Sequence, residues 1–89
     1  MKHIVLAVTI WLLPLAAAAF DIQQVAPGIW AIEGPAEQRN PENLGNNATF
    51  GLIETSEGAV LVDPGGTWAG AEALHEVVRG LTDQPVRVV

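Results

Sequence analysis

The feature that most constrains the fold is a strand, turn, helix and strand pattern in residues 59–89. Residues 59–62 are a short, wholly apolar run, followed by the turn sequence Asp-Pro-Gly-Gly at 63–66 and by a mostly apolar run at 86–89. Two parallel strands need a crossover of about a dozen residues or more, which residues 63–85 supply. The pattern therefore predicts a βαβ unit. An unbroken apolar run also predicts that residues 59–62 are covered on both faces.

The crossover segment has the pattern of a helix that packs on a sheet. Leu74, Val77, Val78 and Leu81 follow the i, i+3, i+4, i+7 spacing of one helix face. Thr67 stands where an N-cap residue is expected, because its hydroxyl can accept a backbone hydrogen bond from the first turn. We therefore predict a helix that begins after Thr67.

Three further runs predict strands that precede this unit. Residues 22–25 and 29–32 are rich in β-branched and aromatic side chains, and the Ala-Pro-Gly sequence between them favours a type II turn and a hairpin. Residues 49–54 form another strand that leads through 55–58 into the apolar run at 59–62. The fold class predicted from all of these segments is α/β.

Residues Gly34 to Asn47 have a different composition. Glycine, proline and asparagine dominate this stretch, and it contains almost no apolar side chains. Such a composition predicts a long exposed loop. Loops of about 12 residues or more in a compact domain are usually functional or disordered, so this loop is a candidate element facing a substrate.

The first 19 residues have the pattern of a secretory signal peptide. Lys2 and His3 give a positive start, residues 4–15 are mainly apolar, and four alanines at 16–19 provide an A-x-A cleavage site before Phe20. A membrane anchor is the alternative, but a span needs roughly 20 apolar residues and this stretch is shorter. We therefore expect an exported protein, periplasmic or secreted, without a stable membrane anchor.

The composition restricts the compartment and the partners. The chain has no cysteine, which suits a bacterial periplasm, where disulfides are permitted but optional. Its formal net charge is −6, and loss of Lys2 with the signal peptide would leave three arginines against ten carboxylates. Nucleic acid and anionic membranes are excluded as expected partners, because the protein would be repelled by both.

Three segments carry a resemblance to a known family. They are V-A-P-G-I-W at 25–30, N-A-T-F-G-L-I at 47–53 and L-V-D-P-G-G at 61–66, with the asparagine-rich loop between the first two. In this order they resemble the N-terminal part of a metallo-β-lactamase-fold hydrolase. They are most similar to the exported zinc metallohydrolases found with periplasmic quinoprotein or sulfur-oxidation systems.

The resemblance implies a fold, an activity and a cofactor. The family fold is a four-layer αβ/βα sandwich, and its zinc centre is built chiefly by an H-x-H-x-D-H motif directly after the strand that corresponds to residues 86–89. Residues 20–89 would then be an N-terminal part of such a domain that stops before the motif. The parent protein would bind zinc, and a metal-bound hydroxide would attack an ester, thioester or amide-type bond of a small-molecule substrate. The zinc ligands would be absent from this chain, and the fragment alone would be inactive.

Asp63 is the one residue to which a role in the site carries over. The family aspartate at this position lies near the metal at the C-terminal end of its strand and supports the site by hydrogen bonding. Open α/β sheets place their chemistry at that edge, which is an independent physical reason. The alternative is an Asx turn, in which the Asp63 carboxylate accepts the N–H of Gly65 or Gly66. The two roles are compatible.

Other candidate residues have simpler interpretations. His75 is expected to face solvent beside Glu72 and Glu76, which have the spacing of an acid and base pair but are better explained as the hydrated face of the helix. Trp30 and Trp68 are candidates for the mouth of a pocket, although large apolar residues beside a strand and a helix more often belong to the core or cover it.

The Gly65-Gly66 pair at a helix start also allows a phosphate cradle. The stretch lacks the Gly-Lys-Ser/Thr ending of a P-loop and the spacing of a dinucleotide fold, and Asp63 would repel an anion. This hypothesis is therefore weak.

A second hypothesis from another class is a small secreted binding module. It would use the Gly34–Asn47 loop and the open sheet edge at residues 86–89 to recruit a partner strand. A single βαβ unit also leaves one sheet face without a covering layer. On the fragment hypothesis we expect residues 20–89 alone to be loosely folded or prone to aggregation.

Overall fold

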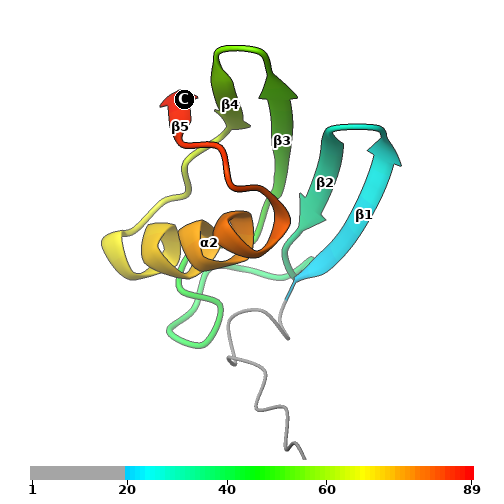
Figure 1. The fold of residues 1–89 in the computed structure, drawn as a ribbon. Helices are drawn as coiled ribbons and strands as arrows, with labels where there is room; N and C mark the ends of the chain where they lie inside the picture. Colours follow the sequence, from blue (N-terminus) through cyan, green and yellow to red (C-terminus); the bar gives the residue numbers. More distant parts are fainter. Residues whose placement is uncertain (1–19) are drawn as a thin grey trace, which may run out of the picture.

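Residues 20–89, the part of the chain that this computed structural model describes, form one mixed sheet with one helix against it (Figure 1). The predicted signal peptide lies outside these residues, and the prediction of its cleavage is neither confirmed nor contradicted. The elements are β1 (Asp21–Ala26), β2 (Ile29–Glu33), β3 (Thr49–Thr55), β4 (Gly58–Val62), α2 (Trp68–Leu81) and β5 (Val86–Val88). The predicted α/β class is confirmed.

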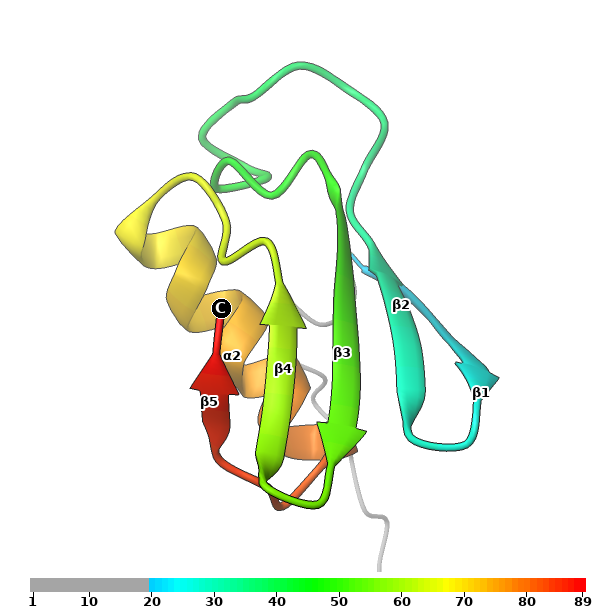
Figure 2. The ribbon, with the colours of Figure 1, turned by 90° about the horizontal axis from the view of Figure 1, so that it is seen from above.

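The strands lie in the order β1-β2-β3-β4-β5, which is also their order along the chain. The first four pair antiparallel, with tight turns between β1 and β2 and between β3 and β4 and a long loop, residues 34–48, between β2 and β3. Strand β4 pairs with β5 in parallel after the crossover through α2. Figure 2 shows β4 and β5 pointing the same way, with α2 behind them. The predicted βαβ unit and the predicted hairpin of β1 and β2 are therefore confirmed.

Helix α2 begins where its sequence predicts, directly after Thr67. The Thr67 hydroxyl accepts the N–H of Gly70 at 2.9 Å, which is the expected N-cap bond. Leu74, Val77 and Val78 are buried against the sheet. The helix ends at Leu81, so the spacing of apolar residues alone located this element correctly.

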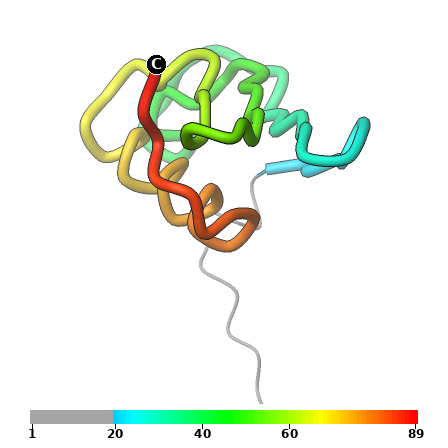
Figure 3. Tube along the Cα trace, turned by 45° about the horizontal axis from the view of Figure 1, so that its top comes forward, coloured from blue at the N-terminus to red at the C-terminus, as the bar shows by residue number. Residues whose placement is uncertain are grey.

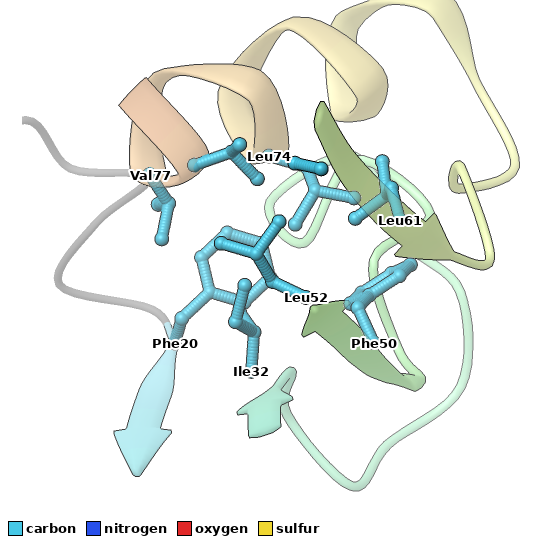
Figure 4. Packing of buried hydrophobic residues seen from close by; sticks show 9 residues of the cluster. Phe20, Ile32, Phe50, Leu52, Leu61, Leu74 and Val77 are labelled. Carbon is cyan, nitrogen blue, oxygen red and sulfur yellow. The ribbon is translucent and has the colours of Figure 1, made fainter. Parts of the chain in front are cut away.

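The core lies between α2 and one face of the sheet, as Figure 4 shows. Alternate residues of the strands point into it because side chains of a strand alternate between faces. Phe20 packs edge to face on Phe50, with ring centroids 6.1 Å apart. The largest fully buried side chains are Phe50, Ile32, Leu52, Leu74 and Val78.

The opposite face of the sheet is open within the described part of the chain. On β4 the side chain of Val62 is 52% exposed and that of Val60 is half-buried, whereas Leu61 between them is buried. The prediction that residues 59–62 are covered on both faces is therefore wrong for this chain segment. One helix covers one face, and residues 20–89 contain no second layer for the other. The open apolar face consists of Ile29, Ile53, Val60 and Val62, which lie in register across three strands.

Helix α2 is too short and too polar to cross a membrane, and residues 20–89 contain no other candidate span.

Candidate functional site

The candidate site is the edge of the sheet where β4 ends and the turn to α2 begins. Asp63 is the first residue beyond β4, and its side chain is exposed. The N–H of Gly65 donates to Asp63 Oδ1 over 3.0 Å. The predicted Asx turn is therefore confirmed, and it fixes one carboxylate oxygen at the carboxyl end of the strand. A supporting role for Asp63 at a metal site remains a prediction.

Strained backbone conformations also occur at this edge. Among residues 20–89 two non-glycine residues have positive φ, Leu44 at 56° and Asp63 at 71°. Aspartate tolerates the left-handed region because its short polar side chain can bond locally, but a leucine there is costly. Surrounding contacts must hold Leu44 in place, and such strain is concentrated at functional sites in proteins.

The contacts that hold Leu44 come from the start of α2. The Thr67 hydroxyl donates to the carbonyl oxygen of Leu44, so the same hydroxyl caps the helix and anchors the loop. One turn further on, Asn46 Nδ2 donates to the carbonyl oxygen of Gly70 over 3.0 Å. Figure 2 shows the loop of residues 34–48 lying beside the turn that leads into α2.

The loop is therefore not the fully exposed segment that its composition predicted. Asn43 and Asn46 are buried. Their side chains hold the loop together by hydrogen bonds, in place of apolar packing. Asn43 Oδ1 accepts the N–H of Gly45 at 3.0 Å, and Asn43 Nδ2 donates to the carbonyl oxygen of Gln38 at 2.8 Å. Polar composition predicted exposure, but here the polar side chains satisfy buried backbone groups.

Two glycines allow this close packing. A Cβ on Gly70 would collide with the carbonyl oxygen of Leu44 and would lie 2.8 Å from Asn46 Oδ1. A Cβ on Gly34 would collide with the carbonyl oxygen of Asn46. The loop can lie on the helix only because both positions lack a side chain.

Asn46 is the least accessible polar residue of this edge, with 3% of its surface exposed. Its Nδ2 is bonded to Gly70, but its Oδ1 is buried without a hydrogen-bond partner among the described residues. A Cβ on Gly65 would lie 3.2 Å from this oxygen and one on Gly70 would lie 2.8 Å from it, so both glycines leave room beside it. This acceptor is adjacent to the turn that presents Asp63.

The other predicted candidates lie elsewhere. His75, Glu72 and Glu76 are exposed on the outer face of α2, as their positions in the sequence predicted. Trp30 is half-buried and packs on the core, so the core interpretation is confirmed for it. That interpretation is wrong for Trp68, which is 83% exposed at the first position of α2.

The described residues do not fit a zinc ion by themselves. Catalytic zinc takes about three protein donors, and no group of three or more His, Cys, Asp or Glu side chains converges anywhere in residues 20–89. Asp63 is a single carboxylate, and His75 lies on the outer face of the helix.

The phosphate cradle also has little support. Asp63 occupies the N–H of Gly65 and Thr67 occupies that of Gly70, so two of the backbone donors near the helix start are taken. The Arg39 guanidinium lies against Gly66, but the Asp63 carboxylate would oppose an anion there.

Comparison of the chain with protein-family models, with curated proteins and with solved structures finds no match. The relation to metallo-β-lactamase-fold hydrolases therefore remains a resemblance of residues 25–30, 47–53 and 61–66. The residues that sequence reasoning missed at this edge are Leu44 and Asn46. Gly70 was the signal in the sequence that could have revealed them. A glycine in the first turn of a predicted helix indicates that another backbone segment packs closely against the helix.

Proposed function

We propose that residues 20–89 form the first part of an exported, zinc-dependent hydrolase with a metallo-β-lactamase fold. The substrate class is a small molecule with an ester, thioester or amide-type bond. The observation that carries the proposal is the position of Asp63, whose carboxylate is fixed by Gly65 at the end of β4. That edge is where open α/β sheets bind their ligands.

The arrangement around Asp63 supports a functional edge. Because β4 and β5 are parallel, their carboxyl ends lie at the same side of the sheet, and residues after β5 would emerge beside Asp63. The family motif expected after β5 would thus bring its donors to the same place. Asp63 has a left-handed backbone conformation, and this strained conformation sets the direction of its carboxylate.

The open face of the sheet is a second supporting observation. The side chains of Ile29, Ile53 and Val60 lie side by side across three strands, and Val62 extends this apolar surface. An α/β sheet normally buries both faces. A further layer over this face is what an αβ/βα sandwich would provide.

The contribution of this chain to the zinc site is limited to positioning. Since residues 20–89 lack a set of three donors, the donors implied by the resemblance would have to come from elsewhere in the parent protein. Asp63 would orient a ligand by hydrogen bonding, as outer partners of metal ligands do. The turn and the loop would hold Asp63 in place.

The decisive experiment is to read the coding sequence beyond codon 89. The proposal expects an H-x-H-x-D-H motif within about ten codons. A stop codon directly after Val89 in an intact gene would overturn it.

A variant of the extended protein tests the role of Asp63. Asp63→Asn keeps the acceptor of the Asx turn but removes the charge, and loss of an outer partner typically lowers metal affinity about 10-fold to 100-fold. Glu57→Gln, at an exposed carboxylate in the β3–β4 turn, is the matched control and should leave zinc affinity unchanged. Equal zinc affinity of both variants would argue against a role for Asp63.

The binding-module alternative has less support. Strand β5 has three residues, follows Pro85 and carries Arg87 at its centre. Short edge strands with a charge and a nearby proline resist strand addition. The loop of residues 34–47 uses many of its polar groups for its own bonds.

A further inference from the structure

Trp68 is the most exposed large apolar side chain on the described part of the chain. It stands at the first position of α2, with 83% of its surface accessible. Figure 3 shows that this end of the helix, in yellow, lies on the far side of the molecule from the β1–β2 hairpin. Tryptophan is enriched among the residues that dominate binding energy in protein interfaces, so an exposed tryptophan indicates a binding surface.

Trp68 is one wall of a shallow hollow on the outer face of α2. Ala71, Glu72 and His75 form the rest of the lining. Trp68, Glu72 and His75 are spaced by four and three residues, so they lie along one face of the helix. The hollow measures about 220 Å³, smaller than the roughly 300–1,000 Å³ of ligand pockets, and suits one side chain of a partner.

The charge of the hollow and its surroundings selects a cation. Glu72 lies one helical turn after Trp68, and Glu76 follows one turn later. An aromatic ring attracts an ammonium or guanidinium group over its face, and a nearby carboxylate adds to the attraction. Residues 20–89 contain ten carboxylates, three arginines and no lysine, so the surface as a whole attracts basic partners.

Two of the three arginines in residues 20–89 have contacts of their own. Arg79 donates to the carbonyl oxygen of Gln84 beyond the end of the helix. Arg39 lies against Gly66 and Gly45. A second copy of this acidic chain and an anionic membrane would both be repelled.

We infer that the outer face of α2 is a docking surface for a basic segment of a partner protein. A lysine or arginine side chain of the partner stacks on the Trp68 indole and places its charged group at Glu72. This surface adjoins the edge of Asp63 at the start of α2 but is formed by the outer face of the helix, and it does not depend on the proposed hydrolase function.

The test measures binding of a labelled hexalysine amide to the full chain by fluorescence anisotropy at low salt. Trp68→Ala should weaken the affinity about tenfold, because it removes the cation–π contact with the indole ring. Val25→Ala, at another exposed apolar residue, should change it by less than about twofold. Trp68→Phe keeps an aromatic face and should retain most of the affinity.

A second pair separates the local carboxylate from the overall charge. Glu72→Gln should weaken hexalysine binding several-fold, and Glu57→Gln, which removes the same charge at the opposite end of the sheet from Asp63, should have about half that effect or less. Circular dichroism spectra should be unchanged in all variants, because each position is exposed.

Three results would overturn the inference. Equal losses in the two glutamate variants would show that hexalysine senses only net charge. No binding by the unmodified chain at millimolar peptide would exclude a basic partner. Light scattering that shows a dimer of the unmodified chain and a monomer of Trp68→Ala would identify a second copy as the occupant.

Discussion

The side-chain amide of Asn46 donates to the carbonyl oxygen of Gly70 over 3.0 Å and so joins the β2–β3 loop to the first turn of α2. The two residues are 24 positions apart in the sequence. Together with the bond from Thr67 to Leu44, this contact makes the loop part of the same edge as Asp63. The geometry of the candidate site therefore depends on a loop that has no regular secondary structure.

Gly70 provides a sharp test of this contact. Glycine to alanine in a helix usually stabilises by up to about 1 kcal/mol, but a Cβ on Gly70 would collide with the carbonyl oxygen of Leu44. We expect Gly70→Ala to destabilise the chain by about 2 kcal/mol or more. Gly80, in the same helix with nothing within 4 Å of its Cβ position, is the matched control. Gly80→Ala should stabilise by about 0.5–1 kcal/mol in urea unfolding, and the same sign for both variants would contradict the structure.

Substitutions of Asn46 test whether its buried contact with Gly70 requires a neutral hydrogen-bond donor. Asn46→Ala removes the donor to Gly70 and should lower the free energy of unfolding by about 1–2 kcal/mol. Asn46→Asp should cost more, about 3 kcal/mol, because a buried carboxylate would face the carbonyl oxygen of Gly70. Asn47→Ala, which removes a more exposed bond to the Glu37 carbonyl, is the control and should cost less than about 1 kcal/mol. Chemical denaturation of the three variants measures the difference, and a harmless Asn46→Asp would refute the burial of Asn46.

Substitutions of Thr67 test the hydroxyl that both caps α2 and anchors the loop. Thr67→Ala loses the N-cap bond to Gly70 and the bond to Leu44, so we expect a loss of about 1.5–2.5 kcal/mol in unfolding free energy. Thr67→Ser keeps the hydroxyl and should cost less than about 0.5 kcal/mol. Protease digestion within residues 34–47 should be faster for Thr67→Ala alone. Equal digestion of both variants would mean that the loop is not anchored here.

Substitutions of Asp63 test its contribution to stability separately from its proposed role in the site. Asp63→Asn tolerates the left-handed backbone and keeps an oxygen acceptor for the Gly65 N–H, so its unfolding free energy should change by less than about 0.5 kcal/mol. Asp63→Ala loses both properties and should cost about 1–2 kcal/mol by thermal or urea unfolding. A costly Asp63→Asn would indicate that the charge itself stabilises the turn.

The two faces of β4 give a further prediction. Val62→Lys places a charge on the open face and should change the unfolding free energy by less than about 0.5 kcal/mol, while reducing self-association in light scattering. Leu61→Lys, one residue earlier on the buried face, should cost more than about 3 kcal/mol. If Val62→Lys unfolds the chain, the face must be covered in solution.

The strands, the helix and their pairing were largely predictable from the sequence. The spacing of Leu74, Val77 and Val78 located α2, and the apolar run at 59–62 with the segment at 86–89 predicted the parallel pair. The site was predictable only at Asp63, where the turn chemistry is local. Burial was predicted wrongly for the loop, for Val62 and for Trp68, since the environment of each depends on distant elements.

The sequence by itself determined the elements of this protein, because side-chain periodicity, capping and turn residues act over a few neighbouring positions. Only the tertiary structure decided that asparagines would be buried at the start of α2, that Gly70 would admit the Leu44 carbonyl, and that one sheet face and Trp68 would stay exposed. These outcomes depend on which distant backbone and side-chain groups meet, and no local pattern encodes that meeting.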